Sequence, residues 1–143
     1  MNERYIRQTM IPEIGEAGQE KLKNAKVLIV GIGGLGSPIS LYLTAAGVGQ
    51  IGLIDDDIVS KSNLQRQILY TEAEIGQSKV ECACRRLSAL NSSTRFETYP
   101  NRFTPDNANR LVSAYDIIVD GCDNAATRYL IDDVCSRFKK PYV

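Results

Sequence analysis

A glycine-rich segment with an apolar run before it carries the residue types that phosphate binding needs. The segment Gly31-Ile32-Gly33-Gly34-Leu35-Gly36 matches the pattern G-x-G-x-x-G, and the residues after it repeat at helical spacing. In that context the pattern predicts a tight turn that brings backbone N–H groups and a helix N-terminus against a phosphate. A purely structural turn is the alternative interpretation. The candidate binding residues in this segment are Gly31, Gly33, Gly34 and Gly36.

An acid stands where a dinucleotide fold places its ribose-binding group. Asp55 follows the apolar run 51–54, a little over ~20 residues beyond the glycine turn. A carboxylate at that place can accept hydrogen bonds from both ribose hydroxyls, and a solvated acid at a strand end is the alternative. Asp56 and Asp57 fit the solvated or helix-capping alternative better.

Two cations point to chemistry on phosphate rather than to hydride transfer. Arg66, in the polar segment 62–67, offers a permanently charged planar fork that matches phosphate oxygens. Lys79 opens a helix expected over 77–90, where the helix macrodipole disfavours a positive charge. With no local acid evident to compensate it, Lys79 is a candidate for holding an anion. A solvated surface lysine is the more common case.

Asp123 and Asn124 follow a fourth predicted strand. Ligands of open parallel sheets bind beyond the carboxyl ends of the strands, where Gly31 and Asp55 are also expected. Asp123 could therefore hold a Mg²⁺ ion that bridges phosphates. Either residue could instead cap the helix expected over 125–138, and both roles are compatible if Asp123 faces the site and Asn124 caps.

The elements that must position these residues alternate between strand and helix. Strands are predicted at 26–30, 51–54, 94–98 and 116–120, with helices at 16–24, 34–46, 77–90, 105–113 and 125–138. This order predicts an α/β fold, Rossmann-like and doubly wound, with a mainly parallel sheet and helices on both faces. One domain spans 1–143, and its long loop over 58–76 is expected to be functional. A fifth strand opens at 141–143, so we expect the natural protein to continue.

Composition excludes several function classes. The 143 residues include 17 Lys and Arg against 17 Asp and Glu, so bulk charge indicates neither a membrane nor a nucleic-acid partner. No apolar run reaches the roughly 20 residues that cross a bilayer, and no signal-peptide core is visible, so we expect a cytoplasmic protein. The absence of histidine removes Ser-His-Asp and Cys-His catalysis. The cysteines lack C-x-x-C spacing and are expected to be buried or idle thiols.

Taken in order, these motifs resemble the ThiF/MoeB/HesA family, the bacterial relatives of ubiquitin-activating enzymes. The resemblance covers essentially the whole chain, and its most specific part is Ser62-Asn63-Leu64-Gln65-Arg66-Gln67. It implies that the protein binds ATP and Mg²⁺ and adenylates the C-terminal Gly-Gly carboxylate of a small ubiquitin-like sulfur-carrier protein, releasing pyrophosphate. It also implies a homodimer.

The resemblance implies a role for each matching residue. Gly34 would lie against the phosphates, Asp55 would take the ribose, and Asp123 would bind the metal. The remaining nucleotide-binding residues would be Asn63, Gln65, Arg66, Lys79 and Asn124. Arg7 would reach the nucleotide of the partner subunit. Catalysis is then assigned to Arg66, Lys79, Asp123 and Arg7.

Family members are longer, and their later half supplies the carrier-binding surface. A zinc ion is expected only in that later part, and this chain alone is expected to be inactive. Asp55-Asp56-Asp57 and the segment 67–71 look closer to the member of thiamine biosynthesis than to that of molybdopterin biosynthesis.

Several alternatives stay open at this level. One is the same activation in molybdopterin biosynthesis, and another is an NAD-dependent oxidoreductase, which leaves Arg66, Lys79 and Asp123 unexplained. A non-catalytic dimerising subunit would keep the fold without the reaction. A tRNA-modifying dehydratase branch is a further interpretation, against which the lack of a basic tract argues mildly.

Overall fold

Four parallel strands form the centre of the molecule. The computed structural model describes residues 2–143. The strands are β1 (Lys26–Val30), β2 (Gln50–Ile54), β3 (Arg95–Tyr99) and β4 (Ile117–Asp120), arranged in the order β3-β2-β1-β4. Every neighbouring pair is parallel. The strand sequence reverses between β1 and β4, and open α/β sheets bind their ligands beyond the carboxyl ends at such a reversal.

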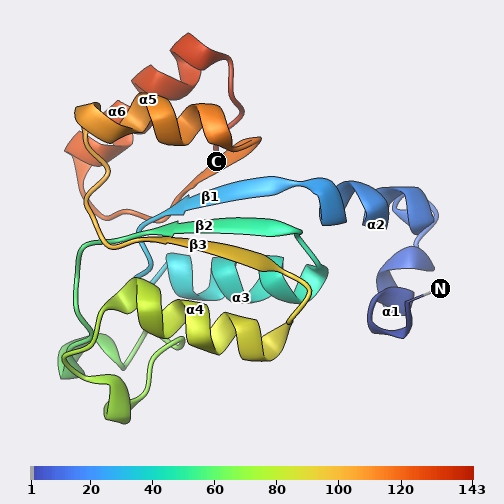
Figure 1. Cartoon of the computed structure of the whole chain (residues 1–143), viewed down its shortest axis with the longest axis horizontal. Coiled ribbons are helices and arrows are strands. Elements are labelled where there is room, and N and C mark those ends of the chain that lie inside the picture. Colours follow the sequence, from blue (N-terminus) through green and yellow to red (C-terminus); the bar gives the residue numbers. More distant parts are fainter. Residues whose placement is uncertain (1) are drawn as a thin grey trace.

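Helices cover both faces of this sheet (Figure 1). The helices α3 (Gly36–Ala46) and α4 (Lys79–Leu90) lie on one face, and α5 (Pro105–Ala114) and α6 (Ala125–Phe138) lie on the other. The sheet is therefore doubly wound, as the alternation of strands and helices predicts.

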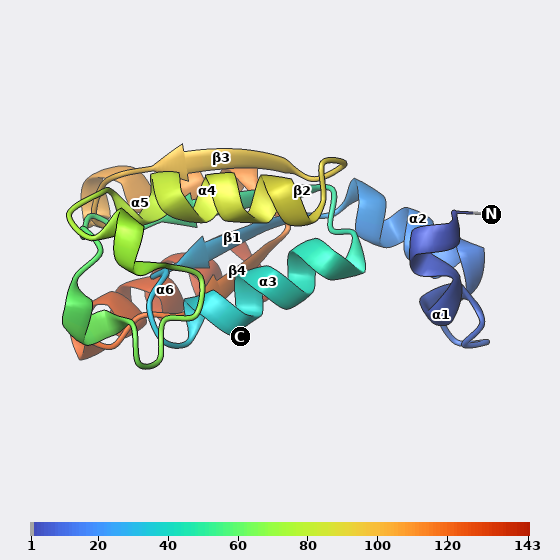
Figure 2. The same ribbon diagram turned by 90° about the horizontal axis from the view of Figure 1, so that it is seen from below.

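Two further helices lie beyond the amino ends of the strands. These are α1 (Ile6–Thr9) and α2 (Gly15–Asn24), and Figure 2 shows α1 at the opposite end of the molecule from the strand carboxyl ends. No helix within residues 2–143 is long and apolar enough to cross a membrane.

Burial on both faces explains why the central strand is continuously apolar. In β1, Val27 and Ile29 join the core beneath α3 and α4, whereas Leu28 and Val30 join the core beneath α5 and α6. All four side chains are at most 4% exposed. A strand of a parallel sheet that is covered on both sides has no polar face, so its sequence shows no alternation.

The elements follow the sequence predictions closely, with small shifts at their ends. The helix predicted from 34 begins at Gly36, because Gly34 and Leu35 belong to the turn, and the helix predicted from 77 begins at Lys79. The segment 58–76 is a loop with two short 3₁₀ turns, as expected. The strand predicted from 141 is confirmed at its start, where Tyr142 bridges Ile118 in parallel.

Candidate functional site

The carboxyl ends of the central strands open into one cavity of about 1180 Å³. Its wall combines the glycine turn, the end of β2, the loop after β3 and the start of α6. Most of the residues that the sequence singles out meet there. They are Gly31, Gly33, Gly34, Asp55, Arg66, Lys79, Asp123 and Asn124.

The glycine turn needs glycine for two separate reasons. Gly31 has a φ of 89°, which L side chains rarely adopt, and a Cβ on it would come within 2.8 Å of the carbonyl oxygen of Gly121. A Cβ on Gly36 would overlap the carbonyl oxygen of Gly31. The first position therefore lets the chain turn sharply beside β4, and the second lets α3 begin close behind β1.

This turn presents unpaired backbone donors to the cavity. Within residues 2–143, the N–H groups of Gly33 and Gly34 donate to no backbone or side-chain acceptor. The helix α3 that follows has no side-chain cap at its N-terminus. Free N–H groups and the positive end of a helix dipole together form a site for an anion such as phosphate.

Asp55 is fixed against this turn by its own hydrogen bonds. One carboxylate oxygen accepts from the N–H of Ile32 at 2.8 Å, and the other accepts from the N–H of Asp57 at 2.9 Å. A carboxylate can accept about four hydrogen bonds, so lone pairs remain for further donors. Asp55 is half-buried in the cavity wall, and the arrangement is compatible with the expected contact to ribose hydroxyls.

Arg66 lies over the glycine turn from the loop between β2 and α4. Its Cδ and Nε atoms would lie 3.5 and 3.6 Å from a Cβ on Gly34, and its Nη1 donates to the carbonyl oxygen of Ser62 at 3.2 Å. The residue remains exposed in the cavity wall. Its planar charge therefore lies beside Gly34 of the turn, a placement that is compatible with binding to phosphate oxygens.

The structure differs from the sequence analysis on two points that concern Lys79, its exposure and its local partner. Its side chain is only 5% exposed, so it is not a solvated surface lysine, and its Nζ lies 3.2 Å from Asp57 Oδ2. Asp57 is thus the local acid that the sequence did not reveal, rather than a solvated or capping acid alone. The N–H of Lys79 also donates to the carbonyl oxygen of Asp57 at 3.0 Å. These two contacts hold the lysine at the cavity wall.

Asn124 takes the capping role that the sequence left open between it and Asp123. Asn124 caps α6, because its Oδ1 accepts from the N–H of Thr127 at 2.9 Å. Asp123 is exposed in the cavity wall. The neighbouring Asp120 is already engaged, since it accepts from the N–H of Cys122 at 2.9 Å and lies 3.7 Å from Arg128 Nε.

The carboxylate of Asp123 is a suitable protein ligand for a Mg²⁺ ion in this cavity. Within residues 2–143, no group of three or more His, Cys, Asp or Glu gathers around a common point. Mg²⁺ is usually held by one or two carboxylates together with phosphate oxygens and water, and Asp123 fits that arrangement.

Four predicted residues lie outside the cavity wall. Gly36 supports the turn from behind, and Asn63 caps a 3₁₀ turn, with its Oδ1 accepting from the N–H of Ser60 at 3.1 Å. Gln65 is exposed. Arg7 lies in α1, at the far end of the sheet (Figure 2), so it cannot reach the cavity of its own chain.

Sequence reasoning missed Gln67, to which it assigned no role. Its side chain is 4% exposed, it lines the cavity, and its Oε1 has no hydrogen-bond partner within residues 2–143. Its Nε2 would lie 3.3 Å from a Cβ on Gly33. The one available signal was its place directly after Arg66, which does not reveal burial.

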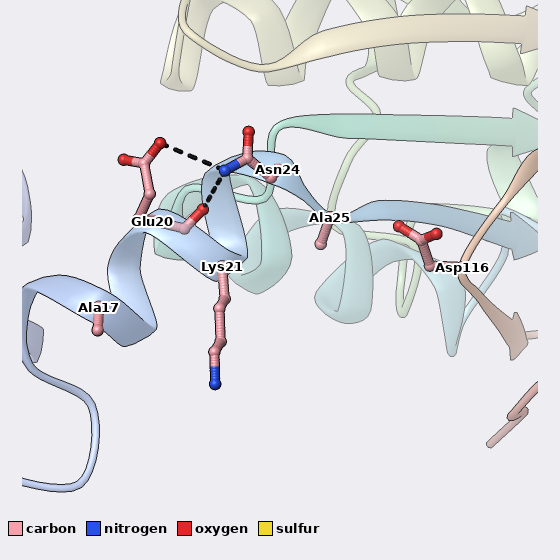
Figure 3. Close-up of a pocket in the computed structure, with 6 residues that line it drawn as sticks. All are labelled: Ala17, Glu20, Lys21, Asn24, Ala25 and Asp116. Atoms are coloured by element: carbon pink, nitrogen blue, oxygen red, sulfur yellow. Dashed lines mark hydrogen bonds between the residues drawn. The ribbon is translucent and has the colours of Figure 1, made fainter.

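A second hollow of about 510 Å³ lies at the amino ends of the strands. Figure 3 shows the Lys21 side chain directed away from Glu20 and Asp116, so the charged groups around this hollow do not converge on one point. Asn24 donates to the carbonyl oxygen of Glu20 at 2.9 Å, and Asp116 accepts from the N–H of Lys26 at 2.9 Å. Asn24 and Asp116 are therefore engaged in local backbone contacts.

Comparisons with known proteins show which family and which proteins this chain resembles. The model of the ThiF family matches residues 5–143. The chain is 48% identical over 141 residues to the sulfur carrier protein adenylyltransferase of Thermus thermophilus, and 52% identical over 140 residues to the adenylyltransferase and sulfurtransferase MOCS3 of Culex quinquefasciatus. It also resembles the solved tRNA N6-threonylcarbamoyladenosine dehydratase TcdA of E. coli in complex with ATP, with a TM-score of 0.90 and 30% identity.

These similar proteins are all longer than the chain. The matches cover 99% of this chain and 52% of the Thermus protein, and 98% of this chain and 32% of the Culex protein. The TcdA match covers 97% of this chain and 57% of that structure. The chain thus spans about half or less of the relatives' length.

Proposed function

The chain belongs to the ThiF family, and from this premise we propose that the protein is an adenylyltransferase of a sulfur-carrier protein. In the proposed reaction, ATP adenylates the C-terminal glycine carboxylate of a small ubiquitin-like carrier. The similar Thermus protein is named for that activity, and the similar E. coli structure contains ATP.

One observation carries the proposal. The cations Arg66 and Lys79, the carboxylate of Asp123 and the free N–H groups of the glycine turn line the same cavity. Binding NAD needs the turn and Asp55 but leaves the cations and Asp123 without a role. A triphosphate accounts for all of these groups, because its charge must be neutralised at several oxygens.

The proposed step is a displacement at the α-phosphorus. A carboxylate oxygen of the carrier forms a bond to that phosphorus, and the bond to the oxygen that bridges to the β-phosphate breaks. Pyrophosphate leaves with the electron pair, and an acyl-adenylate remains. Arg66 and Lys79 would neutralise the charge that builds up on the phosphate oxygens, and the turn would orient the chain of phosphates. No step requires the histidine that the chain lacks.

Asp123 would hold Mg²⁺ beside the phosphates, where the ion supplies charge neutralisation. Asp55 would accept hydrogen bonds from the ribose. We also propose nucleotide contacts for Asn63, Gln65 and Asn124, and the support for these contacts is the family pattern alone. The structure itself shows Asn63 and Asn124 in capping hydrogen bonds.

We propose that the protein acts as a homodimer in the cytoplasm. Arg7 lies far from the cavity of its own chain, so any contact that it makes with a nucleotide must involve a second copy. As the carrier we propose that of thiamine biosynthesis, from the segments at 55–57 and 67–71, with the molybdopterin carrier as the alternative. The carrier-binding surface would lie in the part of the family's fold that this chain does not cover.

Exchange of labelled pyrophosphate into ATP tests the reaction in the full-length protein. We expect a carrier that ends in Gly-Gly to stimulate the exchange and a carrier without this ending to be inert. Arg66→Ala and Asp123→Ala should each reduce the exchange by about a hundredfold, because the first removes a cation proposed to neutralise the transferring phosphates and the second removes the carboxylate proposed to hold Mg²⁺ beside them. The carriers of the two pathways, compared side by side, identify the pathway.

Two exposed residues of α6 provide matched controls. Arg137 and Asp133 pair with each other at 3.2 Å on the surface, and Arg137→Ala and Asp133→Ala should leave the exchange unchanged. Wild-type exchange in the Arg66 and Asp123 variants would contradict their assigned roles. Tighter binding of NAD than of ATP with Mg²⁺, in a titration of the chain, would favour the oxidoreductase instead. Binding of ATP without any exchange would favour a non-catalytic subunit.

A further inference from the structure

The two peptide groups that meet at Ile32, in the middle of the glycine turn, are both held by side chains. The N–H of Ile32 donates to Asp55 Oδ2 at 2.8 Å, and its carbonyl oxygen accepts from the Tyr70 hydroxyl at 2.6 Å. Tyr70 is 6% exposed, belongs to the core beneath α3 and α4, and is absent from the cavity wall. Its hydroxyl therefore reaches the turn from the side away from the cavity.

This contact determines where the next N–H group points. In a trans peptide the C=O and the N–H of one unit point in opposite directions, and no cis peptide occurs in the described residues. Because the carbonyl of Ile32 points to Tyr70, the N–H of Gly33 in the same unit points away from Tyr70. Gly33 lines the cavity, and within residues 2–143 its N–H donates to no acceptor.

The Tyr70 hydroxyl is suited to act as a donor. Burial, and then the nearby carboxylate of Asp55, raise the pKa of Tyr70 above its ordinary value. The phenol therefore stays protonated at neutral pH, and its O–H donates a hydrogen bond to the carbonyl oxygen of Ile32. Tyr70 also belongs to the loop that carries Arg66, and its N–H donates to the carbonyl oxygen of Gln67 at 3.3 Å. The hydroxyl thus joins the two phosphate-facing parts of the site, the loop and the turn.

We propose that Tyr70 is a positioning residue for the nucleotide, whose hydroxyl holds the Ile32–Gly33 peptide with the Gly33 N–H toward the triphosphate. The inference rests on the proposed function only in taking ATP as the ligand. Tyr70 contacts no ligand itself. It acts through the peptide group, so its removal should affect phosphate binding and leave contacts to the nucleoside unchanged.

The substitution Tyr70→Phe tests this by calorimetric titration of the chain with ATP and with adenosine. Phenylalanine leaves the carbonyl of Ile32 buried without its donor, and the peptide loses its fixed orientation. We expect the Kd for ATP to rise about tenfold, which corresponds to about 1.4 kcal/mol, and the Kd for adenosine to stay the same. A role in folding alone would lower the Tm without separating the two ligands.

Tyr115→Phe is the matched control. Tyr115 is 1% exposed in the opposite core, and its hydroxyl pairs with that of Tyr99 at 2.9 Å. Its loss also removes one buried hydroxyl but should change neither Kd. Wild-type ATP affinity in Tyr70→Phe would overturn the proposal, as would an equal weakening of ATP and adenosine. A wild-type chain that does not bind ATP would instead show the proposed function to be wrong, and the inference would fall with it.

If Tyr70→Phe does not fold, the wild-type chain decides by NMR after labelling with ¹⁵N-glycine. The Gly33 amide signal should shift strongly with ATP and remain nearly unchanged with adenosine. A Gly33 signal that ignores ATP while the signals of Gly31 and Gly34 respond would overturn the inference.

Discussion

The two ends of the sheet carry similar residues but differ in what those residues face. At the carboxyl end, Lys79 is buried against Asp57, and the charge of Arg66 lies over backbone donors that have no partner. At the amino end, Lys21 is exposed and Asp116 accepts from the backbone of β1. Each end has a hollow in its surface.

The difference shows that a hollow with charged residues is not by itself a binding site. In a parallel sheet every strand reaches the carboxyl edge from the same direction, and each following helix begins there. Its first N–H groups have no partner within the helix. The chain is then left with donors that water or a ligand must satisfy. At the amino edge the helices end, and the side chains in that hollow form local contacts instead.

The largest expected effect follows from closing the turn at the carboxyl end. Gly36→Ala places a Cβ into the carbonyl oxygen of Gly31, so α3 must move away from β1. We expect a loss of about 3 kcal/mol of unfolding free energy and no measurable ATP binding, from urea unfolding and calorimetric titration. Gly76→Ala is the control: a Cβ there meets nothing within 4 Å, and although its φ of 89° is strained, ATP should still bind. Normal ATP binding by Gly36→Ala would contradict the packing argument.

The second largest effect is expected on ATP affinity, when one lysine at each end of the sheet loses its charge. Lys79→Met keeps the length of the side chain but removes its charge from the cavity wall, and we expect ATP affinity to fall about tenfold. Lys21→Met makes the same change in the opposite hollow, where ATP affinity should not change. Titration of both variants with ATP checks the comparison. Equal affinities would mean that the ion pair of Lys79 with Asp57 serves the fold alone.

A smaller effect is expected from the acid at the amino end. Asp116→Ala removes the acceptor of the Lys26 N–H, a contact that lies in an exposed position. We expect the unfolding free energy to fall by about 0.5 to 1 kcal/mol in urea, with ATP affinity unchanged. Weaker ATP binding in this variant would show that the two ends are coupled, contrary to the comparison.

The smallest effect concerns the buried thiols and pH. Burial raises the pKa of Cys122, in the cavity wall, and of Cys135, in the core beneath α6. The folded thiols therefore stay protonated above the ordinary value of 9.0, at which unfolded thiols ionise. Their contribution to stability is complete below that pH and is lost as the pH rises through the raised values. The Tm should accordingly decline slightly above pH 9.0.

Alkylation by iodoacetamide at pH 8, followed by mass spectrometry, compares the thiol in the cavity wall with the thiol in the core. Cys84 is more exposed than the other thiols and should react first. ATP should slow the reaction of Cys122 but leave that of Cys135 unchanged. Protection of both thiols would indicate a general stabilisation of the fold, and protection of neither would argue against a ligand at the wall.

Much of the site was predictable because its residues follow strand ends. Periodicity located the strands to within a few residues, and parallel strands bring their carboxyl ends to one edge. The turn, Asp55 and Asp123 therefore had to lie near one another. The division of roles between Asp123 and Asn124 was an open alternative, and the cap on α6 resolves it for Asn124.

The contacts within the site could not be predicted, because they join loops that have no periodic pattern. Lys79 meets Asp57 across 22 positions, and Tyr70 meets Ile32 across 38. The burial of Gln67 likewise depends on the path of the loop over 58–76.

The sequence by itself determined which residues reach the carboxyl edge, because short-range hydrophobic periods define strands and helices, and their alternation orders them. The tertiary structure alone decided which side chain pairs with which, because packing selects one path for each irregular loop among many that the local sequence permits. It also placed Arg7 at the far end of the molecule, away from the cavity of its own chain.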